Sequence, residues 1–518
     1  MLTFDTGAAS LPPIAVAVPI VGAAILLAGG RFFPRWLVDA TAILIAAGVT
    51  ALSAIVLRQA ASGPVVTWVA RWLPVHGFSV GIVLQSDPVG AGIAVLAGAL
   101  TTIALLYSWR YFESEEAHYQ ALVLLFLAGM EGFSLTGDLF DMFVFFELMG
   151  VAAYALTGMK VEDPTAVEGS LNFGIVNSLG AYLSLTGIAL LYARTGNLGL
   201  PQLGRALGHD HLSALIVAAF VLVLCGFLVK AALVPFHFWL ADAHAVAPAP
   251  ICVLFSGVMV PLGIYAAFRV YWVVFSPLLD PSDVRRTFLI LGVVTAALGT
   301  TMCLGQRHVK RLLAYSTIAH VGLFTAAMAL LSGSGTSGAL LYVAGHAGAK
   351  SALFLLAGIL LNRYGSVDEH ELFAQGTQAR WLGLAWVVAA FALAGLPPFG
   401  TALGKAVAEE AALDDGQGWL VAVFILVSAL TAGAVLRVAG RVFLGLGPPP
   451  RKADDGQEST GREKPEARLT RIPLTMAAAI GILLVGTLAE GLMPSARAAA
   501  DHAAAFFTHP EIYRRAAL

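Results

Sequence analysis

Long apolar stretches separated by short polar connections run through the chain. Each is close to the roughly 20 residues that an α-helix needs to cross the ~30 Å hydrocarbon core of a bilayer. The pattern therefore predicts an all-α, polytopic membrane protein with about fourteen transmembrane helices. We expect these helices near residues 12–30, 36–57, 86–108, 119–137, 139–159, 168–193, 212–240, 249–270, 286–305, 311–332, 336–361, 381–403, 418–439 and 472–493.

One long hydrophilic stretch interrupts this pattern near the end of the chain. It covers residues 447–471, contains three consecutive prolines and charges of both signs, and is typical of a flexible linker. The lysine and arginine bias of the loops predicts that this linker is cytoplasmic. The expected organisation is N-terminal helices in 1–118, two antiporter-like repeats in 119–270 and 286–439, the linker in 447–471, and a C-terminal transmembrane helix with its tail in 472–518.

Composition supports a membrane protein and excludes several other classes. Of the 518 residues, 58% are hydrophobic and 12% are charged, whereas soluble domains carry roughly 25% charged residues. A net charge of -2 gives no indication of nucleic-acid binding. The three cysteines lie in apolar segments without CxxC spacing, so we expect neither a metal site nor a disulfide. No motif for a nucleotide or a redox cofactor is present, so no cofactor is expected.

Four ionisable residues interrupt the apolar segments. Lys230 lies in the apolar run 212–234, and Glu147, Lys350 and Lys405 lie in similar surroundings. A charge at membrane depth costs at least ~2.5–3.5 kcal/mol, so such residues face a protein interior or a wet cavity and mark transport pathways. These four positions therefore indicate ion translocation.

Two of the expected helices contain prolines near these charges. Pro235 follows Lys230, and the pair Pro397 and Pro398 precedes Lys405. Proline removes a backbone hydrogen bond and breaks a helix, and broken helices are tolerated at membrane depth only inside protein or beside a wet cavity. Breaks at corresponding places in two halves are typical of transporters built from inverted repeats. We therefore expect two inverted five-helix repeats, each with a broken helix.

Five ordered motifs between about residues 80 and 440 point to one family. The chain resembles the antiporter-like membrane subunits of respiratory complex I (the L, M and N type) and of Mrp-type sodium/proton antiporters. The first motif is most similar to the D subunit of Mrp antiporters, which favours that branch. The motifs that carry the resemblance are Leu135–Glu147, Lys230–His244, Val309–Thr317, His346–Lys350 and Gly395–Phe399.

The resemblance implies that Glu147 pairs with Lys230 and tunes its affinity for protons. Burial disfavours the charged form of a lysine and a nearby carboxylate favours it, so separating and re-forming the pair can load and release a proton. A purely structural ion pair between two helices is the alternative.

The resemblance implies further proton-translocation residues along the chain. Lys350 would carry the proton along the central axis with His346, which lies one helical turn away on the same face. Lys405 matches the terminal lysine of the second half-channel. His237 and His244 match the polar end of the broken seventh helix, and histidine suits a relay near neutral pH.

Three other positions bear on this path. The family's usual lysine in the eighth helix is replaced here by Pro261, so the relay would lack a cation between Lys230 and Lys350. His320 is interpreted either as a possible relay residue or as a core histidine. Lys310 is interpreted as a topology determinant or a contact to another subunit.

Three functions from different classes remain open at this point. The first is a proton-translocating subunit of a multi-subunit cation/proton antiporter, with protons as cargo and Na⁺ or K⁺ as candidates for the exchanged cation. The second is the pumping subunit of an NADH–quinone oxidoreductase or a membrane-bound hydrogenase. The third is an energy-coupling membrane subunit for a soluble partner, such as an inorganic-carbon uptake system. In each case we expect a non-enzymatic transport subunit in the cell membrane, with other membrane subunits and the bilayer as partners.

Overall fold

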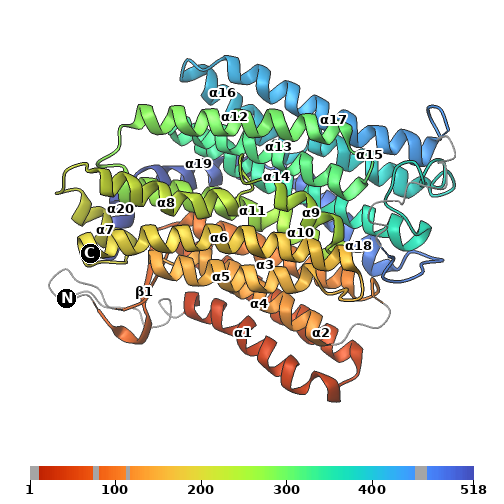
Figure 1. Ribbon diagram of the computed structural model, residues 1–518, viewed down its shortest axis with the longest axis horizontal. Helices are drawn as coiled ribbons and strands as arrows, with labels where there is room; N and C mark the ends of the chain where they lie inside the picture. The colour runs from red at the N-terminus through yellow and green to blue at the C-terminus, as the bar shows by residue number, and fades with distance from the viewer. Residues whose placement is uncertain (1–10, 74–80, 113–116, 450–463) are drawn as a thin grey trace.

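The computed structural model describes residues 11–73, 81–112, 117–449 and 464–518 and shows an all-helical polytopic membrane protein (Figure 1). Its long helices lie side by side along the longest axis, with α1 at one edge of the bundle and α16 at the other. The helices are α1 (Leu11–Gly29), α2 (Arg35–Ala60), α3 (Pro88–Ser108), α4 (Ala117–Leu135), α5 (Leu139–Thr157), α6 (Pro164–Thr195), α7 (Leu200–Leu207), α8 (Ala214–Lys230), α9 (Phe238–Val246), α10 (Ala249–Leu254), α11 (Val260–Val270), α12 (Pro281–Gly305), α13 (Val309–Met328), α14 (Gly333–Tyr364), α15 (Arg380–Ala394), α16 (Gly400–Asp414), α17 (Trp419–Leu444), α18 (Leu474–Leu492), α19 (Pro494–Thr508) and α20 (Pro510–Ala516).

Ten helical segments within the described ranges are long and apolar enough to cross a membrane. All of them coincide with expected stretches. α8 and α15 are apolar but shorter, because each stops at a helix break, and α4 and α13 are long enough but less apolar. Every one of the fourteen expected stretches thus contains a helix, while ten meet the length and hydropathy of a full span on their own.

Polar residues at the helix starts explain where many helices begin. The side chain of Asp138 accepts hydrogen bonds from the backbone N–H groups of Phe140 and Asp141, at 2.8 and 3.1 Å, and so caps α5. Asp87 caps α3 and Ser332 caps α14 in the same way. These side chains satisfy N–H groups that the first turn of a helix leaves free, which matters most in an apolar surrounding.

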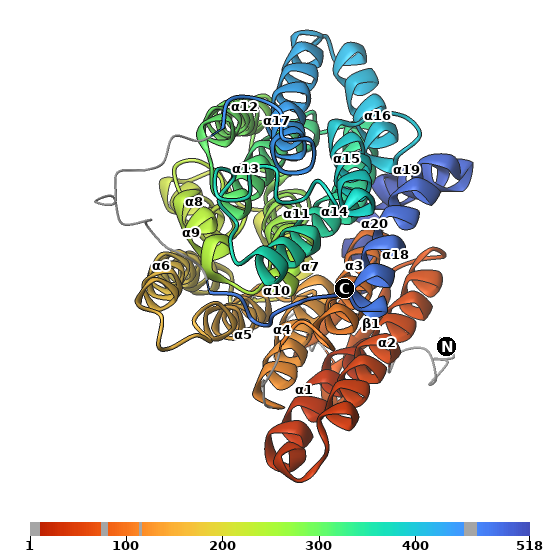
Figure 2. The same cartoon turned by 90° about the vertical axis from the view of Figure 1, so that its right-hand side faces the viewer.

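A continuous helical run occupies the middle of the bundle. It consists of α10, a π-helical turn (Phe255–Met259), α11 and a second π-helical turn (Tyr271–Phe275). The most apolar 18-residue stretch of this run is buried throughout. Helices α3, α8, α13 and α14 pack around it (Figure 2). This central helix therefore meets protein on all sides, and a polar group on it would have to be satisfied by protein or by internal water.

A short antiparallel hairpin, β1 (Val65–Trp68) with β2 (Val83–Ser86), lies between α2 and α3. The sequence predicted no element there. We call this end of the bundle, with the hairpin, α7 and α20, the hairpin end. Tyr513 of α20 donates a hydrogen bond to the carbonyl of Gln85 at 3.1 Å, so the last helix fastens the hairpin to the bundle.

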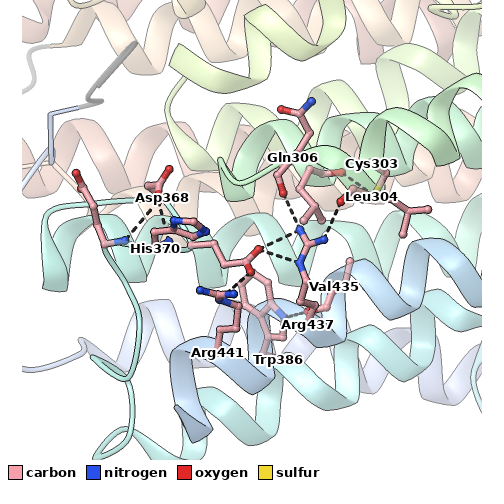
Figure 3. A network of polar contacts seen from close by, with 12 residues as sticks. Cys303, Leu304, Gln306, Asp368, His370, Trp386, Val435, Arg437 and Arg441 are labelled. Carbon is pink, nitrogen blue, oxygen red and sulfur yellow. Dashed lines mark hydrogen bonds and ion pairs between the residues drawn. The ribbon is translucent and has the colours of Figure 1, made fainter. Parts of the chain in front are cut away.

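The opposite end, with residues 306–308 and 365–379, is the loop end. There Arg437 of α17 donates to the carbonyls of Leu304 and Gln306, at 2.7 and 2.6 Å, and pairs with Glu369 at 3.0 Å (Figure 3). Arg441 pairs with the same carboxylate at 3.1 Å. This network joins the ends of α12 and α17 to the connection between α14 and α15.

Part of the expected linker 447–471 falls within the described ranges, whereas residues 450–463 lie outside the described residues. In the described part, Glu466 pairs with Lys160 at 2.9 Å, and Leu469 donates a backbone hydrogen bond to Asn362 at 3.0 Å. The segment that leads into α18 therefore lies against the loop end.

Candidate functional site

Lys230 is the last residue of α8, directly before the first helix break. Its side chain is fully buried, and its Nζ has no hydrogen-bond partner within the described ranges. The ammonium lies 3.9 Å from the centroid of the Phe146 ring, a cation–π arrangement. Residues 231–237 then leave the helical path, and a cis peptide bond joins Val234 to Pro235.

Glu147 lies on α5, beside Phe146. The charges of Glu147 and Lys230 are close enough to interact. The pair is nevertheless not among the ion pairs within 4.0 Å that the described chain contains, and Oε1 of Glu147 is buried without a hydrogen-bond partner. The structure thus brings the two residues into one site, with the Phe146 ring rather than the carboxylate directly against the ammonium.

His237 and His244 lie at the two ends of α9. Nδ1 of His237 is buried and has no partner among the described side chains and backbone. His244 is fully buried, and its Nε2 lies 2.9 Å from the hydroxyl of Ser256, which in turn lies 3.0 Å from the hydroxyl of Thr317. Ser256 belongs to the first π-helical turn, a conformation that occurs frequently at functional sites. A hydrogen-bonded line therefore leads from α9 through the central helix to α13.

Lys350 and His346 lie one turn apart on α14, and both are fully buried. The ammonium of Lys350 donates to the hydroxyl of Ser316 and to the carbonyl of Leu313, the latter at 3.3 Å. Both ring nitrogens of His346 lack a hydrogen-bond partner in the described structure. The imidazole lies 5.2 Å, centroid to centroid, from that of His320.

His320 is a fully buried member of this polar group. Its Nδ1 lies 2.8 Å from the hydroxyl of Tyr342, and its Nε2 lies 3.2 Å from the hydroxyl of Thr431 on α17. Both ring nitrogens therefore have polar partners from two other helices. Both interpretations of His320, as a relay residue and as a core histidine, fit this geometry.

Lys405 lies on α16, just beyond the second helix break, where a cis peptide bond joins Pro397 to Pro398. Its ammonium is 3.9 Å from the carboxylate of Glu409, one turn further along the same helix. The side chain of Lys405 is 13% exposed, whereas Lys230 and Lys350 are completely buried.

Lys230 stands apart from the hydrogen-bonded line that begins at His244. Pro261 is a buried residue of α11, and α11 approaches α8 closely at Gly263, where an added Cβ would lie 2.6 Å from the backbone of Phe227 and Ala231. In the described chain, no hydrogen bond connects Lys230 to His244. Where the family usually has a lysine, Pro261 thus leaves an apolar gap in the path between Lys230 and His244.

Several members of the site, most of them neutral, were not predicted from the sequence, and one lysine has an internal contact that the sequence did not indicate. Most of the neutral members are hydroxyl groups about one turn from titratable residues on the same helices, a spacing that could have revealed them. Lys310 is fully buried and donates to the carbonyls of Ala245 and Ala247 at the end of α9, which speaks against a contact to another subunit and leaves its interpretation as a topology determinant a prediction. The missed residues are the hydroxyl-bearing Ser256, Ser316, Thr317, Tyr342 and Thr431, and the carboxylate Glu409.

The described residues offer no group of three or more histidine, cysteine, aspartate or glutamate side chains able to hold a metal ion. The arrangement instead consists of lysines, histidines and hydroxyl groups within a helix bundle. Such groups can donate and accept protons in turn.

Comparisons with known proteins agree with this architecture. Residues 136–431 match the family described as NADH:quinone oxidoreductase/Mrp antiporter, TM. The chain is 31% identical over 489 residues to the N subunit of the NADH-quinone oxidoreductase of Desulforudis audaxviator, covering 92% of this chain and 94% of that protein. It is 30% identical to the D subunit of the Na(+)/H(+) antiporter of Alkalihalophilus pseudofirmus, over 70% of this chain and 74% of the relative.

Among solved structures, one chain of the Mrp complex from a Dietzia species superimposes with a TM-score of 0.85 and 29% identity. The match covers 99% of both chains. Together, the family match over more than half of the chain and the full-length relatives show that this multi-pass membrane protein belongs to the NADH:quinone oxidoreductase/Mrp antiporter family of antiporter-like membrane subunits.

Proposed function

We propose that this chain is a proton-translocating, cation/proton antiporter-like subunit of a multi-subunit complex, most similar to the D subunit of Mrp antiporters. The observation that carries the proposal is the buried group of proton-exchanging side chains around Lys350. It includes His346, His320 with Tyr342, and the line from His244 to Thr317. Burying so many polar groups at membrane depth is costly and has no purpose in a purely structural bundle.

Several members of the group have polar atoms without a protein partner. Nζ of Lys230, Nδ1 of His237 and both ring nitrogens of His346 are of this kind in the described structure. Buried polar groups that lack a protein partner are generally satisfied by ordered water. These atoms support a hydrated path, in which water connects neighbouring titratable side chains.

In the proposed mechanism, a proton is taken up at Lys230, where Glu147 stabilises the charged lysine. It passes to His346 and Lys350 and leaves by Lys405 beside Glu409. Water bridges the gap at Pro261. We further propose that the two helix breaks belong to two inverted repeats, 119–270 and 286–439, and that the linker 447–471 faces the cytoplasm.

Proton flux in proteoliposomes tests this proposal. The complex would be reconstituted with a pH-sensitive dye inside, and a salt or pH gradient applied from outside. We expect Lys350→Ala to abolish proton movement, because it removes the charged group at the centre of the polar axis. Lys160→Ala is the matched control, since Lys160 pairs with Glu466 at the loop end, away from the axis. Equal flux in both variants would contradict the proposal.

The 31% identity to the N subunit of a complex I relative, over 92% of the chain, favours a second candidate, the pumping subunit of a redox complex. Affinity purification in mild detergent followed by mass spectrometry separates the two candidates. Several small membrane proteins without redox cofactors would support the antiporter. Flavin or iron–sulfur subunits would support the redox pump, and a lone soluble partner would support the energy-coupling role instead.

A further inference from the structure

An apolar cavity lies between the N-terminal helices and the second half of the bundle. Its volume is about 770 Å³. Helices α2, α3, α11, α13, α14 and α19 contribute its walls, and α19 packs across α3 and α14 beside it. Representative wall residues are Leu57, Ile93, Leu96, Ile264, Leu340 and Phe507.

The inner end of the cavity approaches the polar axis. Pro261, Tyr265 and Phe324 lie in this part of the lining. The Phe324 ring packs against the imidazole of His346, with 5.1 Å between the ring centroids. One aromatic side chain therefore separates the cavity from the buried histidine, and whatever fills the cavity also keeps water from this side of the axis.

The two exposed polar side chains of the lining, Arg58 and His502, mark the outer end of the cavity. Among the described lining residues, the polar side chains are Arg58, His502 and Tyr265. The hydroxyl of Tyr265 already donates to the carbonyl of Ser134 at 3.1 Å. Arg58 and His502 are exposed, and His502 hydrogen-bonds the carbonyl of Ala61 at 2.8 Å, which places α19 beside the end of α2. The cavity thus has an apolar body and a basic mouth.

The dimensions favour a chain-like occupant over a helix. An α-helix with side chains is ≈ 10–12 Å across and rises 5.4 Å per turn, so one turn fills on the order of 500 Å³. A cavity of about 770 Å³ therefore holds less than two turns of a partner's helix, far short of a membrane span. A flexible hydrocarbon chain fits the same volume and matches the apolar walls.

We propose that this cavity binds an acyl chain of an anionic phospholipid, with the headgroup phosphate at Arg58 and His502. Arginine donors match phosphate geometry well, and the apolar walls exclude a polar ligand from the body of the cavity. This binding site is independent of the proposed proton transport. The bound chain seals the side of the bundle behind Phe324.

Native mass spectrometry of the complex in mild detergent tests the proposal, together with identification of the extracted lipids. Gly92 lines the cavity, and a Cβ added there meets no atom within 4 Å, so Gly92→Phe fills the cavity without disturbing the helix backbone. We expect it to reduce the retained phospholipid at least about tenfold, because each excluded methylene weakens binding by roughly fourfold. Gly48→Phe is the matched control, since Gly48 also has open space but lies outside the cavity lining.

A second variant tests the headgroup separately and does not depend on filling the cavity. Arg58→Glu should weaken retention of anionic phospholipid by roughly two- to fivefold, the size of an exposed charge interaction. Arg110→Glu, at another exposed position, should not. Unchanged retention in Gly92→Phe would overturn the proposal, as would recovery of a quinone or a small membrane protein from this site. An unchanged preference for anionic lipid in Arg58→Glu would overturn the headgroup assignment.

Discussion

The two lysines beside the helix breaks are held in different ways. Lys230 is fully buried at the end of α8, and its nearest charged group, Glu147, belongs to a different helix. Lys405 is partly exposed, and its partner Glu409 lies one turn away on the same helix. A movement of α5 relative to α8 changes the surroundings of Lys230, whereas the pair on α16 moves as a unit. Similar sequence patterns, a lysine and a proline break, can therefore give one site that senses helix movement and another that does not.

Removing the two lysines should give the largest difference. We expect Lys230→Ala to abolish proton transport in proteoliposomes, because it removes the buried ammonium that takes up the proton in the proposed mechanism. Lys405→Ala should leave measurable transport, since this lysine is less deeply buried than Lys230. Gel filtration of both variants checks that assembly is intact. Normal transport by Lys230→Ala would break the comparison and the mechanism with it.

Substituting the carboxylates Glu147 and Glu409 should give the same difference between the two sites, with a smaller effect on transport. Glu147→Gln should slow transport about tenfold, the effect of about one pKa unit of interaction energy, and should move the pH optimum. Glu409→Gln should slow transport less and leave the optimum in place, because Glu409 and Lys405 lie on one helix and keep their separation. Flux measured across a pH series compares the two variants. An equal shift of the optimum in both would show that the two pairs do not differ as proposed.

A neutral member of the second half should have a smaller effect. Tyr342→Phe removes one hydrogen bond to His320 and keeps the aromatic packing against Phe324. A loss of about 1 kcal/mol corresponds to roughly fivefold slower transport. The flux assay is the measurement, with Tyr364→Phe as a control outside the polar group. Transport by Tyr342→Phe at the unaltered rate would exclude this hydroxyl from the path.

An ion pair between the last turn of α6 and the connection that precedes α8 should have the least effect. Arg194 donates two hydrogen bonds to Asp210 at 2.8 Å each, which lowers the pKa of this carboxyl from 3.8 to about 2. A lowered value means that the pair stabilises the fold above pH 3.8 and that this contribution is lost as the pH falls through about 2. Thermal unfolding of Asp210→Asn should therefore differ slightly from the unaltered protein above pH 3.8 and not near pH 2. Proton transport by Asp210→Asn should be unchanged. A clear loss of transport would mean that the proton-translocation site extends to the Arg194–Asp210 pair.

The helices and most titratable positions could be predicted from the sequence. Apolar length is a local property, and a lysine such as Lys230 or Lys350 inside an apolar run is conspicuous because its burial is so costly. The breaks at Pro235 and at Pro397 followed from the missing N–H of proline. These features depend on neighbours in the sequence rather than on contacts between distant segments.

The remaining features depend on distant contacts. Arg269 and Asp87 form a buried ion pair although they are 182 positions apart. Ser256 and Thr317 could not be singled out in the sequence, because serine and threonine are common in buried helices. A neutral hydroxyl costs little to bury when it hydrogen-bonds within its own helix. The hairpin has no short turn between its strands that would have marked it. The contact of Lys310 with α9 could not be predicted, because a basic residue near the end of a span is first interpreted as a topology determinant.

The contact of Lys310 with α9 has a consequence for local stability. Its ammonium holds the last carbonyls of α9, whereas the first turn, which begins after His237, has no side-chain cap. A helix of nine residues that is secured at one end opens from the other. Amide hydrogens near Phe238 should therefore exchange with solvent deuterium sooner than those near Val246. The opening of α9 would begin next to the helix break that follows Lys230.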